Sequence, residues 1–203
     1  MHEEILSENQ KRLLPLLNRF SGKFGLVGGT AIALHIGHRR SLDLDLATLE
    51  STKNEKVANE VRSLYSIESV LVDEVNELSI VVESVKLTFF TYPFHIEFTD
   101  KLTQVLKMPD LVTLSSMKAY ALGRRAKWKD YVDLYFVFKN YSLKDVVDKS
   151  KGIFKGEFNE KLFREELSYF EDIDYSEEID YMEGFKTNDD VIRNALKEVS
   201  LQK

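Results

Sequence analysis

Two aspartates that stand two residues apart are the side chains of this sequence best suited to chemistry. Residues 42–46 read LDLDL, and this strict alternation predicts an extended strand with Asp43 and Asp45 on one face. Their Cα atoms would lie about 7 Å apart, so both carboxylates can lean onto one cation. Because two negative charges this close repel each other unless a cation lies between them, the pattern indicates a site for Mg²⁺ or Mn²⁺. The alternative is a solvent-facing edge strand whose charges prevent aggregation.

A glycine pair upstream of this strand is a second candidate binding element. An apolar run at residues 24–27 leads into Gly28 and Gly29, where the absent Cβ atoms permit a tight turn and close approach of a ligand. Thr30 is expected to cap a helix over residues 31–36, which Gly37 ends. The free N–H groups at such a helix start can bind a phosphate. Taken alone, a glycine pair is more often only a turn.

The elements that must position these residues are predicted to begin with helices and strands in alternation. Capping-box patterns at Ser7 with Gln10 and at Thr52 with Glu55 predict two helix starts, and Pro15 is expected to restart the first helix. Four β-like runs with short links, which favour antiparallel neighbours, follow at residues 67–72, 78–82, 85–90 and 94–98. The sequence therefore predicts an α/β (α+β) fold with a mixed sheet flanked by helices.

Helices dominate the rest of the chain. Asp110 is a candidate cap for the next helix, whose end Gly123 should loosen. Further helices are expected near residues 128–139, 143–150, 159–170 and 189–201. We expect a core over residues 1–108 and a helical part over residues 109–203 that completes the active site.

Composition excludes several classes of protein. The chain has 203 residues, of which 43% are hydrophobic and 31% charged, so it suits one globular unit with a sizeable core. No apolar run approaches the roughly 20 residues of a transmembrane helix, and the polar, acidic start lacks a signal-peptide pattern, so we expect a cytoplasmic protein with no membrane partner. The absence of cysteine excludes thiolate metal sites.

Charge is distributed unevenly along the chain. The net charge of −6 argues against a generally basic surface that coats nucleic acid. Residues 118–129 nevertheless hold five basic side chains and no acid, whereas residues 157–183 hold eleven acids and two basic side chains. We expect the basic run to meet a polyanion and the acidic segment to repel it.

Asp130 and Asp133 lie in a segment that is apolar nearly all round, which is typical of a buried helix. Being three residues apart, they share one side of it and must face something polar or positive. Two interpretations stay open: a role in a functional site, or an N-cap with a salt bridge to Arg124 or Lys127. Lys118 adjoins an apolar stripe and needs an anionic partner there, although we expect Lys118→Ala to fold normally.

Two groups of motifs resemble known families. Val27, Gly28, Gly29 and the segment Asp43-Leu44-Asp45-Leu46, with thirteen residues between Gly29 and Asp43, match the signature of the nucleotidyltransferase superfamily. The segment KAYALGRRAKWKDYVDLYFVF, with Lys118, Arg124-Arg125, Asp130 and Asp133, is similar to the second half of the AbiEii/AbiGii toxin family. The resemblance covers roughly residues 26–140. It implies a minimal nucleotidyltransferase fold with a helical C-terminal part.

The resemblance also implies roles for residues. Gly28, Gly29 and Thr30 would hold the triphosphate of a nucleoside triphosphate, Asp43 and Asp45 would hold Mg²⁺, Lys118 would contact the phosphates, and Asp130 would be an additional acidic residue of the site. Arg40 and Ser41 are further nucleotide-binding candidates, and Asp133, Arg124 and Arg125 are possible site residues. His38, beside Arg39 and Arg40, is expected to have a structural or phosphate-side role. The pair His35 and His38 is a weak zinc ligand set.

The sequence departs from the superfamily at a third carboxylate. The superfamily places that acid on a strand which corresponds here to residues 85–90, whose polar side offers Lys86 and Thr88. Either Asp130 or, less favoured, Glu97 supplies the missing charge, or metal binding is weak.

The leading hypothesis is a Mg²⁺-dependent nucleotidyltransferase that acts as the toxin of a toxin–antitoxin or abortive-infection system. Its acceptor would be RNA, above all tRNA, docked on the basic run with Trp128 able to stack on a base. A cognate antitoxin protein or repressor is the expected partner. The alternative is a catalytically inactive relative that binds a nucleotide, or one that engages an antitoxin through its acidic C-terminal part.

Overall fold

The computed structural model of the chain describes residues 1–102, 106–122 and 124–202, and Gly123, expected to loosen a helix end, lies outside them. Its centre is a five-stranded sheet in which β2 and β5 are parallel and the other neighbours antiparallel. The strand order is β1 (Gly25–Val27), β2 (Leu44–Thr48), β5 (Val85–Thr91), β4 (Glu77–Val82) and β3 (Ser69–Glu74). The predicted mixed sheet is confirmed.

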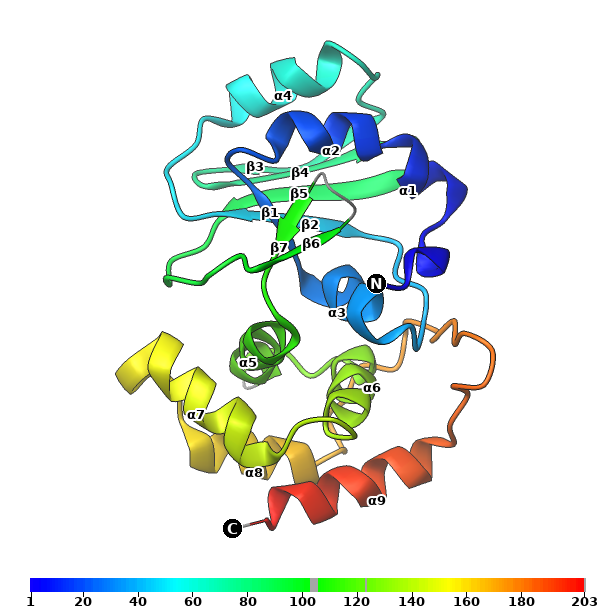
Figure 1. Cartoon of the computed structure of the whole chain (residues 1–203), viewed down its shortest axis with the longest axis vertical. Helices are drawn as coiled ribbons and strands as arrows, with labels where there is room; N and C mark the ends of the chain where they lie inside the picture. Colours follow the sequence, from blue (N-terminus) through cyan, green and yellow to red (C-terminus); the bar gives the residue numbers. More distant parts are fainter. Residues whose placement is uncertain (103–105, 123, 203) are drawn as a thin grey trace.

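The two faces of this sheet differ in polarity. Leu44, Leu46, Leu87 and Phe89 point to one face, and all are buried. Phe89 packs there on Phe20 at the end of helix α2 (Leu14–Phe20). Figure 1 shows α2 and helix α4 (Asn54–Arg62) over this side of the sheet and helix α3 (Gly28–Ile36) on the other side. Because side chains alternate along a strand, Asp45 and Thr88 belong to the face that α3 covers.

Three of the four predicted β-like runs are strands, namely β3, β4 and β5. The prediction of a strand over residues 94–98 is wrong, because these residues form an irregular segment. The physical reason is that β5 is paired with β2 on one edge and β4 on the other, so no free edge remains beside it. The chain instead forms a separate two-stranded sheet from β6 (Asp100–Leu102) and β7 (Leu106–Met108).

One of the two predicted capping boxes is observed in the structure. Ser7 and Gln10 form the predicted capping box of helix α1 (Glu8–Arg12), and Pro15 stands in the first turn of α2. The Thr52 box is wrong, because α4 starts at Asn54 and the Asn54 amide donates to the carbonyl oxygens of Glu74 and Glu77.

The predicted Thr30 cap is also wrong. Helix α3 starts three residues earlier than predicted, at Gly28, and the Thr30 hydroxyl inside its first turn donates to the carbonyl oxygen of Asp43. Gly37 ends the helix in the left-handed conformation, as predicted.

The C-terminal half is helical, as predicted, and lies beyond α3 from the main sheet (Figure 1). The Asp110 carboxylate accepts a hydrogen bond from the Thr113 N–H at the start of helix α5, which confirms the predicted cap. The elements are α5 (Leu111–Leu122), α6 (Trp128–Val137), α7 (Leu143–Phe154), α8 (Glu160–Ser168) and α9 (Asp189–Ser200), with short 3₁₀ turns η1 (Glu3–Ile5) and η2 (Lys155–Glu157). Within the described ranges, no helix has the length and apolar character needed to cross a membrane.

Candidate active site

Two cavities open beside the strand that carries the two aspartates. The first, which we call the Asp45 cavity, has a volume of about 410 Å³. Its lining includes Gly28, Asp45, Thr88, Lys118, Arg124 and Arg125. The second, the Asp43 cavity, has a volume of about 170 Å³ and is lined by residues 39–43, Lys129 and residues 177–180. Asp45 therefore lines the first cavity and Asp43 the second.

Gly28 is required by its contact with Asp45. Its φ of +74° lies in the left-handed region, and a Cβ built on it would lie 2.3 Å from Asp45 Oδ2. A Cβ on Gly29 would lie 2.7 Å from Nη2 of Arg39. The glycine pair thus lets the start of α3 approach both the carboxylate of Asp45 and the guanidinium of Arg39.

Asp45 is half-buried, and its carboxyl has no hydrogen-bond donor or ion-pair partner among the described residues. Burial, and next the charge of Asp43, raise the pKa of Asp45, while the more distant charges of Lys86, Lys118 and Arg125 oppose this rise. A carboxylate in this situation gains from a bound cation, and oxygen ligands are those that Mg²⁺ and Mn²⁺ prefer. The donor set therefore fits such an ion at Asp43 and Asp45.

Position 88, where the resemblance implied a third carboxylate, holds a threonine. Thr88 on β5 is the register partner of Asp45 on β2, and the Ser79 hydroxyl donates to its hydroxyl at 3.3 Å. Across the described residues, no group of three or more Asp, Glu or His side chains is arranged to hold a metal ion.

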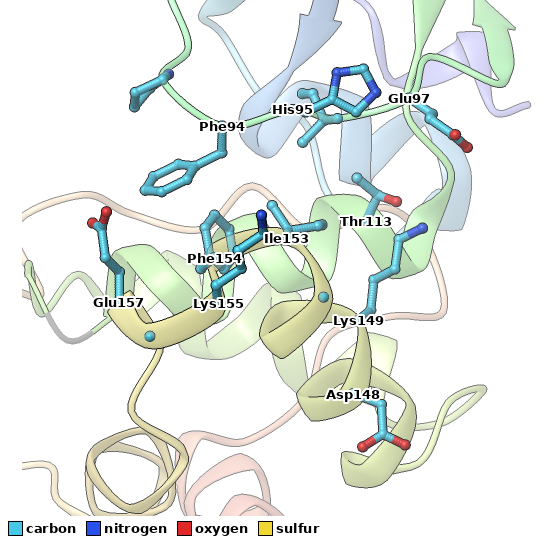
Figure 2. Close-up of a pocket in the computed structure, with 14 residues that line it drawn as sticks. Phe94, His95, Glu97, Thr113, Asp148, Lys149, Ile153, Phe154, Lys155 and Glu157 are labelled. Atoms are coloured by element: carbon cyan, nitrogen blue, oxygen red, sulfur yellow. The ribbon is translucent and has the colours of Figure 1, made fainter.

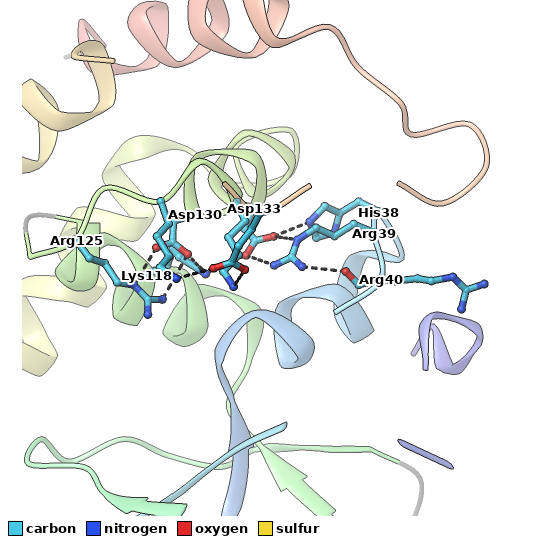
Figure 3. A network of polar contacts seen from close by, with 10 residues as sticks. His38, Arg39, Arg40, Lys118, Arg125, Asp130 and Asp133 are labelled. Carbon is cyan, nitrogen blue, oxygen red and sulfur yellow. Dashed lines mark hydrogen bonds and ion pairs between the residues drawn. The ribbon is translucent and has the colours of Figure 1, made fainter. Parts of the chain in front are cut away.

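A buried network of charges connects α5, α6 and the segment after α3 (Figure 3). Asp133 accepts hydrogen bonds from Nε2 of His38 at 2.8 Å and from Nε and Nη2 of Arg39 at 2.7 and 2.9 Å. Nζ of Lys118 lies 2.6 Å from Oδ1 of Asp130 and 3.0 Å from Oδ2 of Asp133. Both carboxyl groups are fully buried. The network fixes Lys118 at the wall of the Asp45 cavity.

Opposite charges control the protonation of this network. Burial alone would raise the pKa of Asp133, but the charges of Arg39 and Lys118, with the hydrogen bonds from His38 and Arg39, hold it well below its usual range. Burial likewise opposes the charge on Lys118, yet Asp130 and Asp133 raise the pKa of its amine. Lys118 is therefore a permanent cation, whose ammonium donates a hydrogen bond to Asp130 and forms an ion pair with Asp133.

Of the two interpretations of Asp130 and Asp133, the salt bridge is observed, but with other partners than expected. Asp130 pairs with Lys118 and with Nε of Arg125 at 3.0 Å. Arg124 instead stacks on the ring of Tyr120 at 3.6 Å, and Lys127 pairs with Glu177. The prediction of a bridge to Arg124 or Lys127 is therefore wrong. His38 has a structural contact with Asp133, and His35 contacts the carbonyl oxygen of Pro109.

The structure divides the other predicted site residues among three cavities. Arg124 and Arg125 line the Asp45 cavity, whereas Arg40 and Ser41 line the Asp43 cavity. Glu97 lies in a third cavity of about 840 Å³, between residues 93–97 and α7 (Figure 2). Glu97 is thus not brought to the Asp45 cavity.

Sequence reasoning missed several walls of the Asp45 cavity. Glu77, Phe90, Tyr92 and Tyr120 all line it. The ring of Tyr120 stacks on Phe154, with centroids 4.1 Å apart, and Phe154 lines the third cavity, so this aromatic pair separates the two spaces. The period of two on β5 is the signal that could have placed Phe90 beside Thr88.

Comparison with known proteins identifies the fold. Over 80% of its length, the chain superimposes on 76% of a candidate nucleotidyltransferase from H. pylori, with 18% identity and a TM-score of 0.52. Over 95% of its length, it superimposes on 82% of MenT4, a nucleotidyltransferase toxin from Mycobacterium tuberculosis H37Rv, with 12% identity and a TM-score of 0.57. The predicted mixed α/β architecture is confirmed and resembles that of a nucleotidyltransferase toxin.

Sequence comparison adds one relative. The chain is 28% identical over 129 residues to the uncharacterised protein aq_aa25 of Aquifex aeolicus (strain VF5). This match spans 58% of the chain and 59% of that relative. No model of a known protein family matches the chain.

Proposed function

We propose that the chain is a Mg²⁺-dependent nucleotidyltransferase that transfers a nucleotide from a nucleoside triphosphate to an RNA acceptor, with tRNA as the first candidate. We assign it to the AbiEii/AbiGii type, a cytoplasmic toxin that a cognate antitoxin protein or repressor controls. One observation carries the proposal. The half-buried Asp45 carboxyl has no donor or cation of its own within the described chain, is acted on by the charge of Asp43, and lines a cavity of nucleotide size on this fold.

The Asp45 cavity suits the nucleotide better than the Asp43 cavity does. Ligand sites for small molecules occupy about 300–1,000 Å³. Of the two cavities, only the Asp45 cavity, at about 410 Å³, falls within this range. Its walls combine aromatic rings with the cations Lys118, Arg124 and Arg125. Such walls can stack on a base and bind phosphates. Residues 1–108 would form the catalytic core, and residues 109–203 would supply these cations.

The chain's own residues would act mainly by position and charge. Asp43 and Asp45 would hold the ion, which when bound supplies positive charge against the charge that develops on the phosphates. Lys118, positioned by Asp130 and Asp133, would hold the phosphates in line, and the Gly28 and Gly29 amides would assist it. Asp130 and Asp133 would act as positioning residues through Lys118.

The proposed transfer forms one bond at phosphorus and breaks another. The acceptor hydroxyl oxygen forms a bond to the α-phosphorus, the bond from that phosphorus to the bridging oxygen breaks, and pyrophosphate leaves with the electron pair. The hydroxyl proton passes to solvent or to a carboxylate of the pair. No other reactant is required.

The test is transfer of label from each of the four α-labelled nucleoside triphosphates to total RNA in the presence of Mg²⁺. We expect labelled RNA with the natural chain and none with Asp45→Asn. A matched control is Asp148→Asn, which removes an exposed aspartate that pairs with Lys144 outside both cavities. Label on a protein band alone would show that the acceptor is a protein and not RNA.

The alternative function is that of an inactive relative that binds a nucleotide or an antitoxin. Thr88 favours it, because the position opposite Asp45 has no acid. Nucleotide binding without transfer to any acceptor, under conditions where the protein is folded, would establish this alternative and overturn the proposed enzymatic activity.

A further inference from the structure

The acidic segment that was expected to repel a polyanion lies against basic residues of the same chain. We call residues 174–182 the acidic strap. At one end, the Trp128 N–H donates to the Asp174 carbonyl oxygen at 3.0 Å, and the Asp174 N–H donates to that of Ala126 at 2.8 Å. At the other end, the Arg40 N–H donates to the Asp180 carbonyl oxygen at 2.8 Å, and the Met182 N–H donates to that of His38 at 3.1 Å. The strap therefore spans from α6 to the segment after α3.

Between these attachments, the acids of the strap pair with cations. Glu177 Oε1 lies 2.5 Å from Nζ of Lys127, and its other oxygen contacts Nζ of Lys129. Asp180 lies 3.5 Å from Nε of Arg40. Glu177 and Asp180 thus hold three cations at the wall of the Asp43 cavity and beside it.

These ion pairs are accessible to solvent. The side chains of Glu177 and Asp180 are 42% and 68% exposed, and those of Arg40, Lys127 and Lys129 are 41%, 37% and 22% exposed. Ion pairs that are partly open to solvent are screened by salt, so a polyanion can compete for the cations. The buried pairs of Lys118 with Asp130 and Asp133 differ in this respect, because they leave no exposed cation.

The place of the Asp43 cavity suits an acceptor. In an in-line transfer the nucleophile approaches the phosphorus from the side opposite the leaving group. With the donor phosphates on Gly28 and Lys118 in the Asp45 cavity, the Asp43 cavity is the second space that reaches the aspartate pair and is left for the acceptor. Its volume of about 170 Å³ lies below the range of whole-ligand sites but can take a phosphate group.

We propose that Arg40, Lys127 and Lys129, at the Asp43 cavity, bind the phosphate backbone of the RNA acceptor, and that the acidic strap occupies these cations until RNA displaces it. Glu177 and Asp180 stand in for backbone phosphates. This inference rests on the proposed function for the direction from which the acceptor arrives. Of the basic run, the proposal assigns Lys127 and Lys129, the two lysines paired with the strap, to the RNA, and it leaves Lys118 and Arg125 to the nucleotide side.

The experiment measures RNA binding without any transfer. The probe is a fluorescein-labelled tRNA transcript, titrated by anisotropy at several salt concentrations against the natural chain, Glu177→Gln and Glu183→Gln. Both variants remove one exposed negative charge, but only Glu177 pairs with cations of the described chain. We expect Glu177→Gln to bind the transcript several-fold more tightly than Glu183→Gln does. Equal gains in RNA affinity in the two variants would overturn the proposal that the strap competes with RNA for these cations.

The double variant Lys127→Gln with Lys129→Gln tests the cations. We expect weaker RNA binding and a salt slope smaller by about 1–2, because each lost phosphate contact removes roughly 0.7–0.9 from the slope. Affinity for a nucleoside triphosphate, measured in parallel by calorimetry, should stay unchanged. Loss of nucleotide affinity with RNA binding intact would show that these lysines bind the phosphates of the nucleoside triphosphate, and it would overturn the proposal.

The outcomes separate this inference from the proposed function. If the expected RNA-binding pattern is observed while no label is ever transferred, the proposed enzymatic activity is wrong and the proposed RNA site under the acidic strap is supported. If label is transferred while Glu177→Gln binds RNA like the natural chain, the inference about the strap is wrong and the proposed enzymatic activity is supported. Should the double lysine variant fail to fold, the comparison of Glu177→Gln with Glu183→Gln decides alone.

Discussion

Asp45 on β2 lies directly across the parallel ladder from Thr88 on β5, so a carboxylate at position 88 would face the aspartate pair. Neighbouring strands are about 4.8 Å apart, and side chains at paired positions point to the same face. The position where a third acid would complete a cation site therefore holds a hydroxyl, which accepts a hydrogen bond from Ser79.

Thr88→Asp should create a tighter metal site. With three carboxylates in reach, we expect the affinity for Mn²⁺ to rise about tenfold or more, equivalent to about 1.4 kcal/mol for each factor of ten. Without metal the same variant should melt at a lower temperature, because three like charges then repel. Calorimetric titration with Mn²⁺ measures the first effect.

Ser79→Asp is the matched control for Thr88→Asp. Ser79 pairs with Thr88 on the next strand, about 10 Å from Asp45 at the strand spacing. It adds the same charge out of reach of the aspartate pair. A rise in Mn²⁺ affinity of the same size in both variants would show that general charge, and not the geometry of Asp45 with position 88, controls binding.

Gly28→Ala should damage both the fold and the metal site. A methyl group would lie 2.3 Å from Asp45 Oδ2, and the φ of +74° costs a residue with Cβ about 1–2 kcal/mol. We expect a lower urea midpoint and loss of Mn²⁺ binding. Gly22→Ala is the control, because no atom lies within 4 Å of its Cβ. Normal Mn²⁺ binding by Gly28→Ala would mean that Asp45 can move without loss of the site.

Lys118→Ala should unfold more easily, in contrast to the expectation from sequence that it folds normally. Its Nζ contacts two fully buried carboxylates, and removal of one member of a buried ionic group costs about 3–5 kcal/mol. Urea unfolding measures this loss. Lys144→Ala, which removes an exposed lysine paired with Asp148, should change the midpoint little.

The same variant tests the phosphate role of Lys118. In the cold, where the protein stays folded, Lys118→Ala should transfer no labelled nucleotide. Full transfer by the folded variant would move phosphate binding to Arg124 and Arg125.

The sequence predicted elements that depend on local pattern. The alternation of residues 42–46 and the glycine pair predicted β2 and the turn into α3, and the period of two on β5 predicted that Thr88 occupies the site face. Burial of α6 predicted that Asp130 and Asp133 need positive partners. These features follow from residues close together in the chain.

Features that depend on distant residues could not be predicted in this way. Arg39 reaches Asp133 across 94 residues, and Glu177 reaches Lys129 across 48, so no local pattern relates them. Residues 94–98 have a strand-like composition, but both edges of β5 were already used by strands from elsewhere. The division of Asp43 and Asp45 between two cavities depends in the same way on α5, α6 and the acidic strap.

The contribution of Glu177 to stability should depend on pH. Partial burial would raise its pKa, but hydrogen bonds and charges from Lys127 and Lys129 lower the pKa of Glu177 from 4.5 to about 2. A carboxyl whose pKa is lowered on folding stabilises the folded protein above its unfolded pKa, and this stabilisation is lost as pH falls toward the folded pKa. The urea midpoint of the natural chain should therefore exceed that of Glu177→Gln at pH 7, and the difference should shrink between pH 4.5 and pH 2. Glu183→Gln should match the natural chain throughout that range. A difference between the natural chain and Glu177→Gln that is as large at pH 3 as at pH 7 would show that Glu177 stabilises the strap by packing and not by its charge.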